Sequence, residues 1–236
     1  KGFFFPKPQT SDLVWFGVKL LEAAKKAYES RTSAKMGVAQ TFIPEEKRVM
    51  LNRRDPLNPD AAQYPVTVVK FTRFEKEEKK NGSLLGLLVN YAVHGTVLPR
   101  ENTLLTADYV GYLVKTLEEA YPTIKGNFVY FNGPCGEINP LSSELKQKID
   151  KAHTIEDLTN EDIYDQKGSW EDALRIGATI AEQALSVLKD VECRNQQNFS
   201  VVQKRVYVPI LDYNYGSDLP SALRRLIFRF KKCLFT

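Results

Sequence analysis

The sequence predicts an α/β protein in which helices flank a mixed β-sheet and the loops at the strand ends form the site. Two apolar runs, residues 84–93 and 127–131, have the length and composition of buried strands. Between them, apolar side chains recur at helical spacing over residues 107–121. Because sites in open α/β sheets lie beyond the carboxyl ends of the strands, the polar loops that follow these two strands should lie side by side.

A helix and a strand are expected before this β-α-β unit. Apolar residues at helical spacing predict a helix that ends near residue 30, with Ser11 or Asp12 as its cap. Residues 35–43 have the pattern of a strand, in which Gly37 favours a bulge.

A hairpin makes the predicted sheet mixed. Residues 66–74 alternate and are rich in β-branched side chains, and the charged stretch that follows them ends in Asn81-Gly82, a strong turn signal. This strand should therefore pair antiparallel with residues 84–93, whereas a β-α-β crossover joins parallel strands.

Residues 49–60 are expected to form a long irregular loop, because Asn, Asp and Pro recur along them. The loop contains Arg53 and Arg54. Either these side chains are solvated, or they contact an anion or oxyanion, since guanidinium is a rigid and permanently charged group.

Beyond Pro140 the chain becomes polar, and residues 142–168 are expected to be an excursion over the surface with short helices at 144–152 and 159–164. The later elements are expected to be, in order, a helix capped by Ser169 at 170–189, a strand at 199–209 and a basic amphipathic helix at 217–236. The apolar side of that last helix is expected to pack on protein rather than on a membrane.

The composition argues against several classes of protein. The 236 residues, 43% of them hydrophobic, are expected to form one α/β domain with a sizeable core. The net charge of +4 is spread along the chain and gives no reason to expect nucleic-acid binding. A membrane span needs about 18 apolar residues, and no apolar run in the sequence is that long. No signal peptide is visible, and the spacing of the three cysteines does not indicate a disulfide framework. We therefore expect a cytoplasmic protein, or a secreted one if an upstream signal has been removed.

The two strand-end loops hold the residues that could carry chemistry. His94 ends the first apolar strand and is either a structural residue or a metal-binding or catalytic one, whereas His153 is expected on the surface. Residues 132–140, rich in Gly and Pro, form either a tight turn or a loop that points successive backbone N–H groups at an oxyanion. Cys135 in this loop is a candidate nucleophile, although the sequence shows no group that would activate it.

Parts of the chain resemble the neutral/alkaline (non-lysosomal) ceramidase family. The matching segments are the His-Gly-Thr loop that begins at His94, Asn-Thr-Leu-Leu-Thr-Ala-Asp-Tyr-Val-Gly-Tyr from Asn102, and Phe-Asn-Gly-x-x-Gly-Glu-Ile-Asn-Pro from Phe131. Asn52-Arg53 is similar to the Asn-Arg loop of that family. The resemblance extends over about residues 12–190, in the family's order and spacing.

Members of this family are zinc amidases that cleave the N-acyl bond of ceramide. The resemblance therefore implies that His94 is a ligand of one zinc ion and that Arg53 lies near the substrate head group or the oxyanion. The implied residues of the catalytic loop are Gly136 and Glu137, with Asn132 and Gly133 as substrate contacts. Asp108, together with Asn102, would orient the zinc ligand, or Asp108 would cap the helix that it begins, which we favour.

The chain departs from the family pattern at the serine nucleophile and at the zinc ligands. Asn139 has the position of the serine, and an amide can orient water or substrate but is not a nucleophile in this setting. The family's other zinc ligands, a His, a Glu and a Tyr, would lie before Lys1 and after Thr236. We therefore expect this chain to be part of a longer ceramidase-like domain, with zinc ligands beyond His94 outside it or unidentified.

We predict a ceramidase-like, zinc-dependent hydrolase that acts on an amide (N-acyl) or related bond of a small-molecule or lipid-like substrate. Zinc-bound water would attack, Arg53 and the backbone amides of residues 133–138 would stabilise the oxyanion, and Asn139 would orient water or substrate. One alternative is a non-catalytic binding or scaffold relative that has lost the nucleophile and the complete metal site. Another is an acyl transferase that uses Cys135.

Overall fold

A computed structural model gives the fold of residues 9–74, 82–164, 166–195, 200 and 202–206. The chain divides into two compact units, Lys1–Gln197 and Asn198–Thr236. All the helices and strands of the described residues belong to the first unit.

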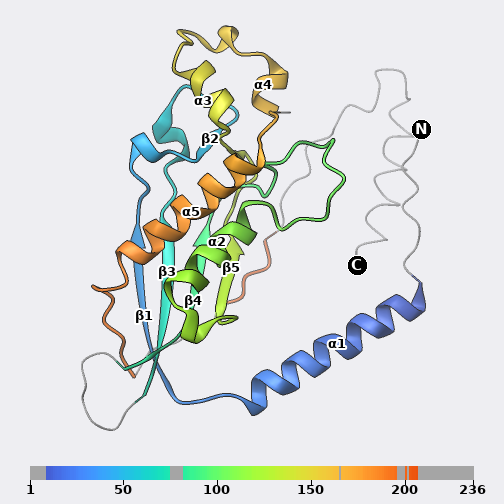
Figure 1. Cartoon of the computed structure of the whole chain (residues 1–236), viewed down its shortest axis with the longest axis vertical. Helices are drawn as coiled ribbons and strands as arrows, with labels where there is room; N and C mark the ends of the chain where they lie inside the picture. The colour runs from blue at the N-terminus through green and yellow to red at the C-terminus, as the bar shows by residue number, and fades with distance from the viewer. Residues whose placement is uncertain (1–8, 75–81, 165, 196–199, 201, 207–236) are drawn as a thin grey trace. The chain divides into compact units, whose positions relative to one another are not determined.

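A four-stranded mixed sheet forms the centre of this unit (Figure 1). Its strands lie in the order β1 (Ala34–Thr41), β3 (Val66–Arg73), β4 (Leu84–Tyr91) and β5 (Phe128–Asn132). The first three pair antiparallel, and β4 pairs parallel with β5. The predicted mixed sheet, with its antiparallel hairpin and its one parallel crossover, is therefore confirmed.

Two long helices, α2 (Asp108–Ala120) and α5 (Trp170–Ser186), pack against each other and lie on one face of the sheet (Figure 1). Ser169 caps α5 as predicted, because its hydroxyl accepts the N–H of Asp172 while the Asp172 carboxylate accepts the N–H of Ser169. The core between helices and sheet is mostly aliphatic, and each large side chain in it contributes about 1.5–3 kcal/mol to folding. Its members include Val68, Leu87, Val89, Leu113, Leu117, Ile176 and Ile180.

The two helices can approach closely because Gly177 faces α2. A Cβ atom at Gly177 would clash with the carbonyl oxygen of Tyr109 and would lie 2.7 Å from the backbone nitrogen of Leu113. The glycine therefore sets the distance between α2 and α5.

A second, two-stranded sheet pairs β2 (Met50–Asn52) antiparallel with β6 (Ile138–Pro140). The prediction of an irregular loop throughout residues 49–60 is wrong at Met50–Asn52, which were too few to show a strand pattern. The pairing joins the Asn52-Arg53 segment to the loop that follows β5.

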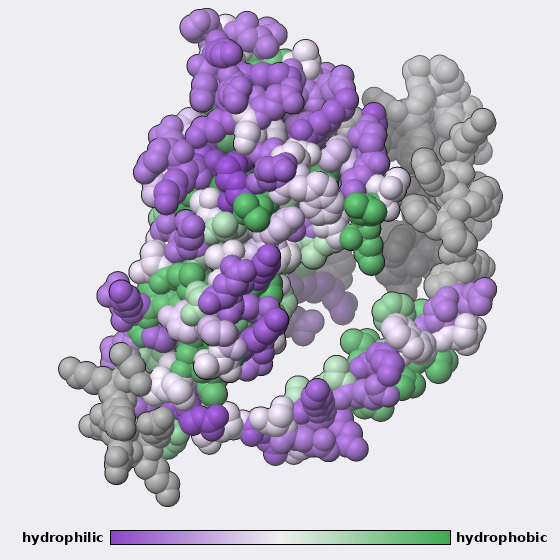
Figure 2. Space-filling view, viewed as in Figure 1, coloured by the Kyte–Doolittle hydropathy of each residue, from purple (hydrophilic) through white to green (hydrophobic). Residues whose placement is uncertain are grey.

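The polar segment after β6 contains the two predicted short helices, α3 (Ser143–Ile149) and α4 (Asn160–Tyr164). Its surface is mostly hydrophilic (Figure 2). A small core still holds it together, made of Leu51, Leu141, Leu145, Leu158 and Ile163. Single 3₁₀ turns occur at Glu45–Lys47, Pro59–Ala62, Pro122–Ile124 and Ile155–Asp157.

Three predictions of local structure need correction. Helix α1 (Thr10–Glu29) starts after Gln9, so Ser11 and Asp12 lie in its first turn instead of capping it. Gly37 pairs in regular register with Lys70, and the irregular step lies between Phe71 and Thr72 of β3. A Cβ atom at Gly37 would lie 2.5 Å from the carbonyl oxygen of Glu192, so close approach explains this glycine.

The strand predicted at 199–209 does not form over residues 202–206. The remainder of that strand except residue 200, the hairpin turn at 75–81 and the helix at 217–236 lie outside the described residues.

Candidate functional site

The loops that follow β4 and β5 lie side by side, as the parallel pairing of these strands requires. The N–H of Gly133 donates to the carbonyl oxygen of Tyr91 at 2.8 Å, and the N–H of His94 donates to that of Ile138 at 3.1 Å. His94 is thereby fixed to the loop of residues 132–138, and this predicted juxtaposition is confirmed.

The two loops bring a histidine and a cysteine into contact. The Sγ atom of Cys135 lies 3.5 Å from Nδ1 of His94 and accepts a hydrogen bond of 3.3 Å from Nδ2 of Asn132. Cys135 and His94 are both half-buried. The sequence shows no group near Cys135 that would activate it, whereas in the structure His94 and Asn132 both contact its sulfur. The signal that could have found this pair was the β-α-β crossover, which places residue 94 opposite residue 135 across two strand ends.

Asn132 contacts the half-buried Tyr130, which in turn contacts the buried Tyr109. The Tyr130 hydroxyl lies 3.1 Å from Oδ1 of Asn132, 2.8 Å from the carbonyl oxygen of Tyr91 and 2.7 Å from the Tyr109 hydroxyl. Tyr109 also donates to the carbonyl oxygen of Val93. Burial raises the pKa of Tyr130 to about 12, so its hydroxyl remains protonated at neutral pH. No pattern in the sequence predicted this network.

Arg53 and Arg54 both bind the loop after β5. The Arg53 guanidinium donates a 2.6 Å hydrogen bond to the carbonyl oxygen of Gly136 and lies 5.5 Å from the ring centre of Tyr164. The Arg54 side chain forms an exposed ion pair of 2.7 Å with the carboxylate of Glu137. Both arginines therefore have partners within the protein.

Within this loop, three backbone N–H groups point at no acceptor among the described residues. Gly133 and Ile138 donate to the carbonyl oxygens of Tyr91 and Cys135. The N–H groups of residues 135–137 donate to no acceptor within the described parts of the chain. A Cβ atom at Gly136 would meet nothing within 4 Å. The free amides are therefore those of residues 135–137, a narrower set than the predicted 133–138.

Asp108 connects the histidine loop to the start of α2. Its carboxylate accepts the N–H groups of Tyr109 at 2.8 Å, of Val97 at 3.1 Å and of Leu98 at 3.0 Å. Its φ angle is +53°, a value that is uncommon for any residue with a side chain. Asn102 lies in the same loop, where its amide closes a turn with the backbone of Leu104.

Asn139 is buried and lies in β6 opposite Leu51. Its side-chain amide donates a hydrogen bond of 2.9 Å to the carbonyl oxygen of Ile163, which fastens α4 to β6. A role of Asn139 toward water or substrate remains a prediction.

The described residues could supply part of a zinc site. Among them, no three His, Cys, Asp or Glu side chains lie together in a way that could hold a metal ion. His94 and Cys135 offer two donor atoms, and a catalytic zinc needs about three protein ligands. No helix in the described parts of the chain is long and apolar enough to cross a bilayer.

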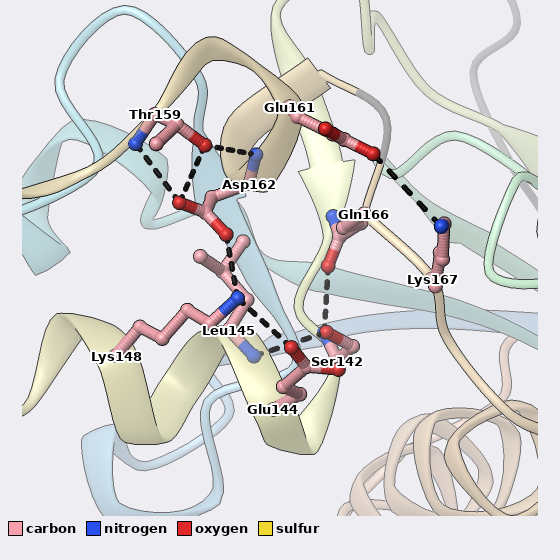
Figure 3. Close-up of a pocket in the computed structure, with 9 residues that line it drawn as sticks. All are labelled: Ser142, Glu144, Leu145, Lys148, Thr159, Glu161, Asp162, Gln166 and Lys167. Carbon is pink, nitrogen blue, oxygen red and sulfur yellow. Dashed lines mark hydrogen bonds and ion pairs between the residues drawn. The ribbon is translucent and has the colours of Figure 1, made fainter.

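A cavity of about 210 Å³ lies between α3 and α4, and none of the predicted site residues lines it (Figure 3). The Lys148 ammonium crosses it and binds the carboxylates of Asp162 at 2.6 Å and Glu144 at 2.8 Å. Glu161 and Lys167, which also line the cavity, form an ion pair of 3.9 Å, so each charged side chain of the lining already has a partner of opposite charge.

Comparison with known proteins leaves the chain without an assigned family. No protein-family model and no curated protein matches it. The solved structure of neutral ceramidase from Pseudomonas aeruginosa matches 71% of this chain with 18% sequence identity and a TM-score of 0.49. A ceramidase complexed with C2 matches 65% of it, with 18% identity and a TM-score of 0.40. The chain spans 24% and 21% of the lengths of these two proteins, and neither likeness is close enough to assign a family.

Proposed function

We propose that this chain is part of a ceramidase-like hydrolase that acts on an amide (N-acyl) or related bond with the help of one zinc ion. The observation that carries the proposal is the contact between His94 and the loop of residues 132–138, since these are two of the segments that resemble the ceramidase family. A lipid-like N-acyl compound is the proposed substrate.

Zinc, when bound, supplies a Lewis acid and an acidified water. His94 would hold it, and ligands beyond the described residues would complete the site. The free N–H groups of residues 135–137 would receive the oxyanion, because amides without internal partners can bind a developing negative charge without rearrangement. Arg53 would position these amides by holding the carbonyl oxygen of Gly136, and Asp108 would fix the histidine loop.

The test is zinc content per chain, measured by elemental analysis on the longest native form of the protein. We expect about one zinc per chain. His94→Ala should lose the zinc and the hydrolysis of N-acyl substrates such as ceramide. The control is His153→Ala, which removes an exposed histidine and should leave both unchanged. Zinc that persists in His94→Ala would remove this histidine from the ligand set. Absence of zinc from the unmodified protein would favour the alternative of a non-catalytic binding relative.

The contact between Cys135 and His94 also favours a second candidate, a cysteine-dependent acyl transferase. In this case the Cys135 sulfur would attack the acyl carbon and pass its proton to His94, and the bond from that carbon to the leaving group would break to give a thioester, with the leaving group taking the proton from His94; an acceptor amine or alcohol would then displace the thiolate and take the acyl group. Alkylation of Cys135 should then abolish activity while any zinc is retained, and Cys193→Ser should not change this result. Activity that survives complete alkylation of Cys135 would exclude the transferase.

A further inference from the structure

One face of the four-stranded sheet carries an apolar row that belongs to no hydrophobic core of the described residues. Side chains alternate along a strand, so the burial of Val68 in the core with α2 and α5 places its neighbour Val69 on the opposite face. The pairing registers extend Val69 into a row across all four strands, formed by Val38, Val69, Leu88 and Val129. None of these four belongs to either core, and Val38 and Val129 are 57% and 49% exposed. We call this side of the sheet the free face.

Two aromatic side chains enlarge the free face. Phe71 and Phe131 lie two residues beyond Val69 and Val129, on the same side of their strands, and Phe131 is 55% exposed. Strands that pair in parallel, as β4 and β5 do, are usually buried on both faces of the sheet. Because large exposed apolar patches mark interaction sites, we expect the free face to have a partner.

Helix α1 is a second apolar surface without a cover. All its residues are exposed, and Leu13, Phe16 and Leu20, which recur at helical spacing, are 59%, 59% and 69% exposed. Hydrophobic side chains are visible along this helix (Figure 2). Its opposite side carries two ion pairs, Lys19–Glu22 and Lys25–Glu29. A helix with one apolar and one charged side is suited to pack its apolar side against protein.

We propose that the chain forms a two-fold dimer in which α1 of each copy packs on the free face of the other copy. One chain holds both halves of a helix-on-sheet contact, yet it does not join them. Helix α1 buries none of its residues, although only residues 30–33 separate it from β1. Exchange of an identical element between two copies covers both surfaces in a closed, symmetric assembly. This inference goes beyond the proposed function and does not depend on it.

The sizes of the two surfaces match. Helix α1 has 20 residues and is about 30 Å long, and the eight residues of each of β1, β3 and β4 span about 26 Å. The exchange makes the contact twice, so about 400 Å² buried on each surface at each contact would reach a standard interface of about 1,600 Å². The apolar side of a helix of this length supplies an area of that order.

The experiment measures the mass of the full chain in solution by light scattering, over a range of concentrations. We expect a dimer. Leu20→Lys in α1 and Val129→Lys on the free face should each weaken dimerisation by about 100-fold or more, because an unpaired ammonium group resists burial. Both positions are exposed within one chain, so circular dichroism should show unchanged secondary structure. The matched control is Leu174→Lys, at a 50% exposed leucine of α5 on the other side of the sheet, which should remain dimeric.

Mixing the two variants tests the exchange itself. In a dimer of one Leu20→Lys chain and one Val129→Lys chain, both substitutions fall in the same contact, and the other contact is intact. A second substitution adds little to a contact that is already lost, so the mixture should dimerise about 10-fold or more tightly than either variant alone.

Recovery of the dimer in the mixture supports the exchange of α1. A monomeric unmodified chain would overturn the proposal, and so would a dimer that persists in both variants. Failure of the mixture to recover would also overturn it, because helix-on-helix or sheet-on-sheet contacts gain nothing from mixing.

Discussion

The Arg53 guanidinium donates a hydrogen bond to the carbonyl oxygen of Gly136, a residue 83 positions further along the chain. The backbone N–H of Arg53 also donates to the carbonyl oxygen of Glu137 at 3.0 Å. These two bonds hold the loop after β5 against the end of β2. The loop is thus held in a conformation in which the N–H groups of residues 135–137 have no acceptor among the described residues.

Replacing Arg53 by alanine should loosen this loop. The variant loses a charge-assisted hydrogen bond, so we expect a loss of about 1 kcal/mol in the free energy of unfolding. Activity should fall by more than this loss of stability explains, because the loop that Arg53 holds carries the free N–H groups. The control is Arg54→Ala, because its ion pair with Glu137 is exposed and should contribute about 0–1 kcal/mol. Denaturant unfolding and hydrogen exchange of the bonded amides of Gly133 and Ile138, at the two ends of the loop, measure both variants. Equal exchange in the two would contradict a special role for Arg53.

Removal of the Tyr130 hydroxyl should weaken the hydrogen-bond network that holds Asn132. Tyr130→Phe leaves Asn132 without its partner and leaves polar groups of Tyr91 and Tyr109 with one bond fewer, so we expect a loss of about 1–3 kcal/mol in stability. Tyr28→Phe, at an exposed tyrosine of α1, is the control and should leave the stability unchanged. A Tyr130→Phe variant with unchanged stability would contradict the network.

The sequence could predict those elements whose side chains repeat over several turns or strand residues. Strand β4, helix α2 and strand β5 follow from apolar periodicity, and their β-α-β order placed the loops of His94 and Cys135 together. Strands β2 and β6 could not be predicted, because each has three residues and their partners lie far apart in the sequence. Their pairing depends on the tertiary fold.

The details of the site lay beyond sequence patterns for a related reason. The contact between Cys135 and His94 depends on the path of the loop between β5 and β6 and on side-chain rotamers, neither of which leaves a periodic signal. Asn139 was expected to face the site because it aligns with a serine in a resembling family. It lies in β6, where its amide is bonded to the carbonyl oxygen of Ile163.

Gly177 should tolerate no larger side chain. Gly177→Ala places a methyl group against the backbone of α2, so the helices must separate, and we expect a loss of about 1–3 kcal/mol despite the better helix propensity of alanine. Gly17→Ala is the matched control in α1, where a Cβ atom meets nothing within 4 Å and alanine favours the helix by about 1 kcal/mol. Thermal unfolding should show a lower midpoint only for Gly177→Ala. A stabilised Gly177→Ala would show that α2 and α5 are further apart.

Asp162 should contribute stability that disappears in acid. Its hydrogen bonds from Lys148 and Thr159 lower the pKa of its carboxyl to about 2, whereas the pKa in an unfolded chain is about 3.9. A carboxyl with a depressed pKa stabilises the fold above its unfolded pKa and loses that effect as the pH falls toward its folded pKa. Unfolding measured between about pH 6 and pH 2 should therefore show a weaker pH dependence in Asp162→Asn. Asp12→Asn, at an exposed position of α1, should leave the dependence unchanged.

Asp108 combines an unusual backbone angle with three accepted hydrogen bonds, and substitutions can separate the two. Asp108→Ala removes the acceptors and keeps a side chain at φ +53°, so it should be the most destabilised variant, by about 3 kcal/mol or more. Asp108→Gly also removes the acceptors but relieves the backbone, and should be more stable than Asp108→Ala by about 1 kcal/mol. Asp108→Asn suits the angle and keeps one acceptor oxygen, so it should be the least destabilised. Denaturant unfolding ranks the three variants, and an alanine variant as stable as the glycine variant would show that the backbone here is not strained.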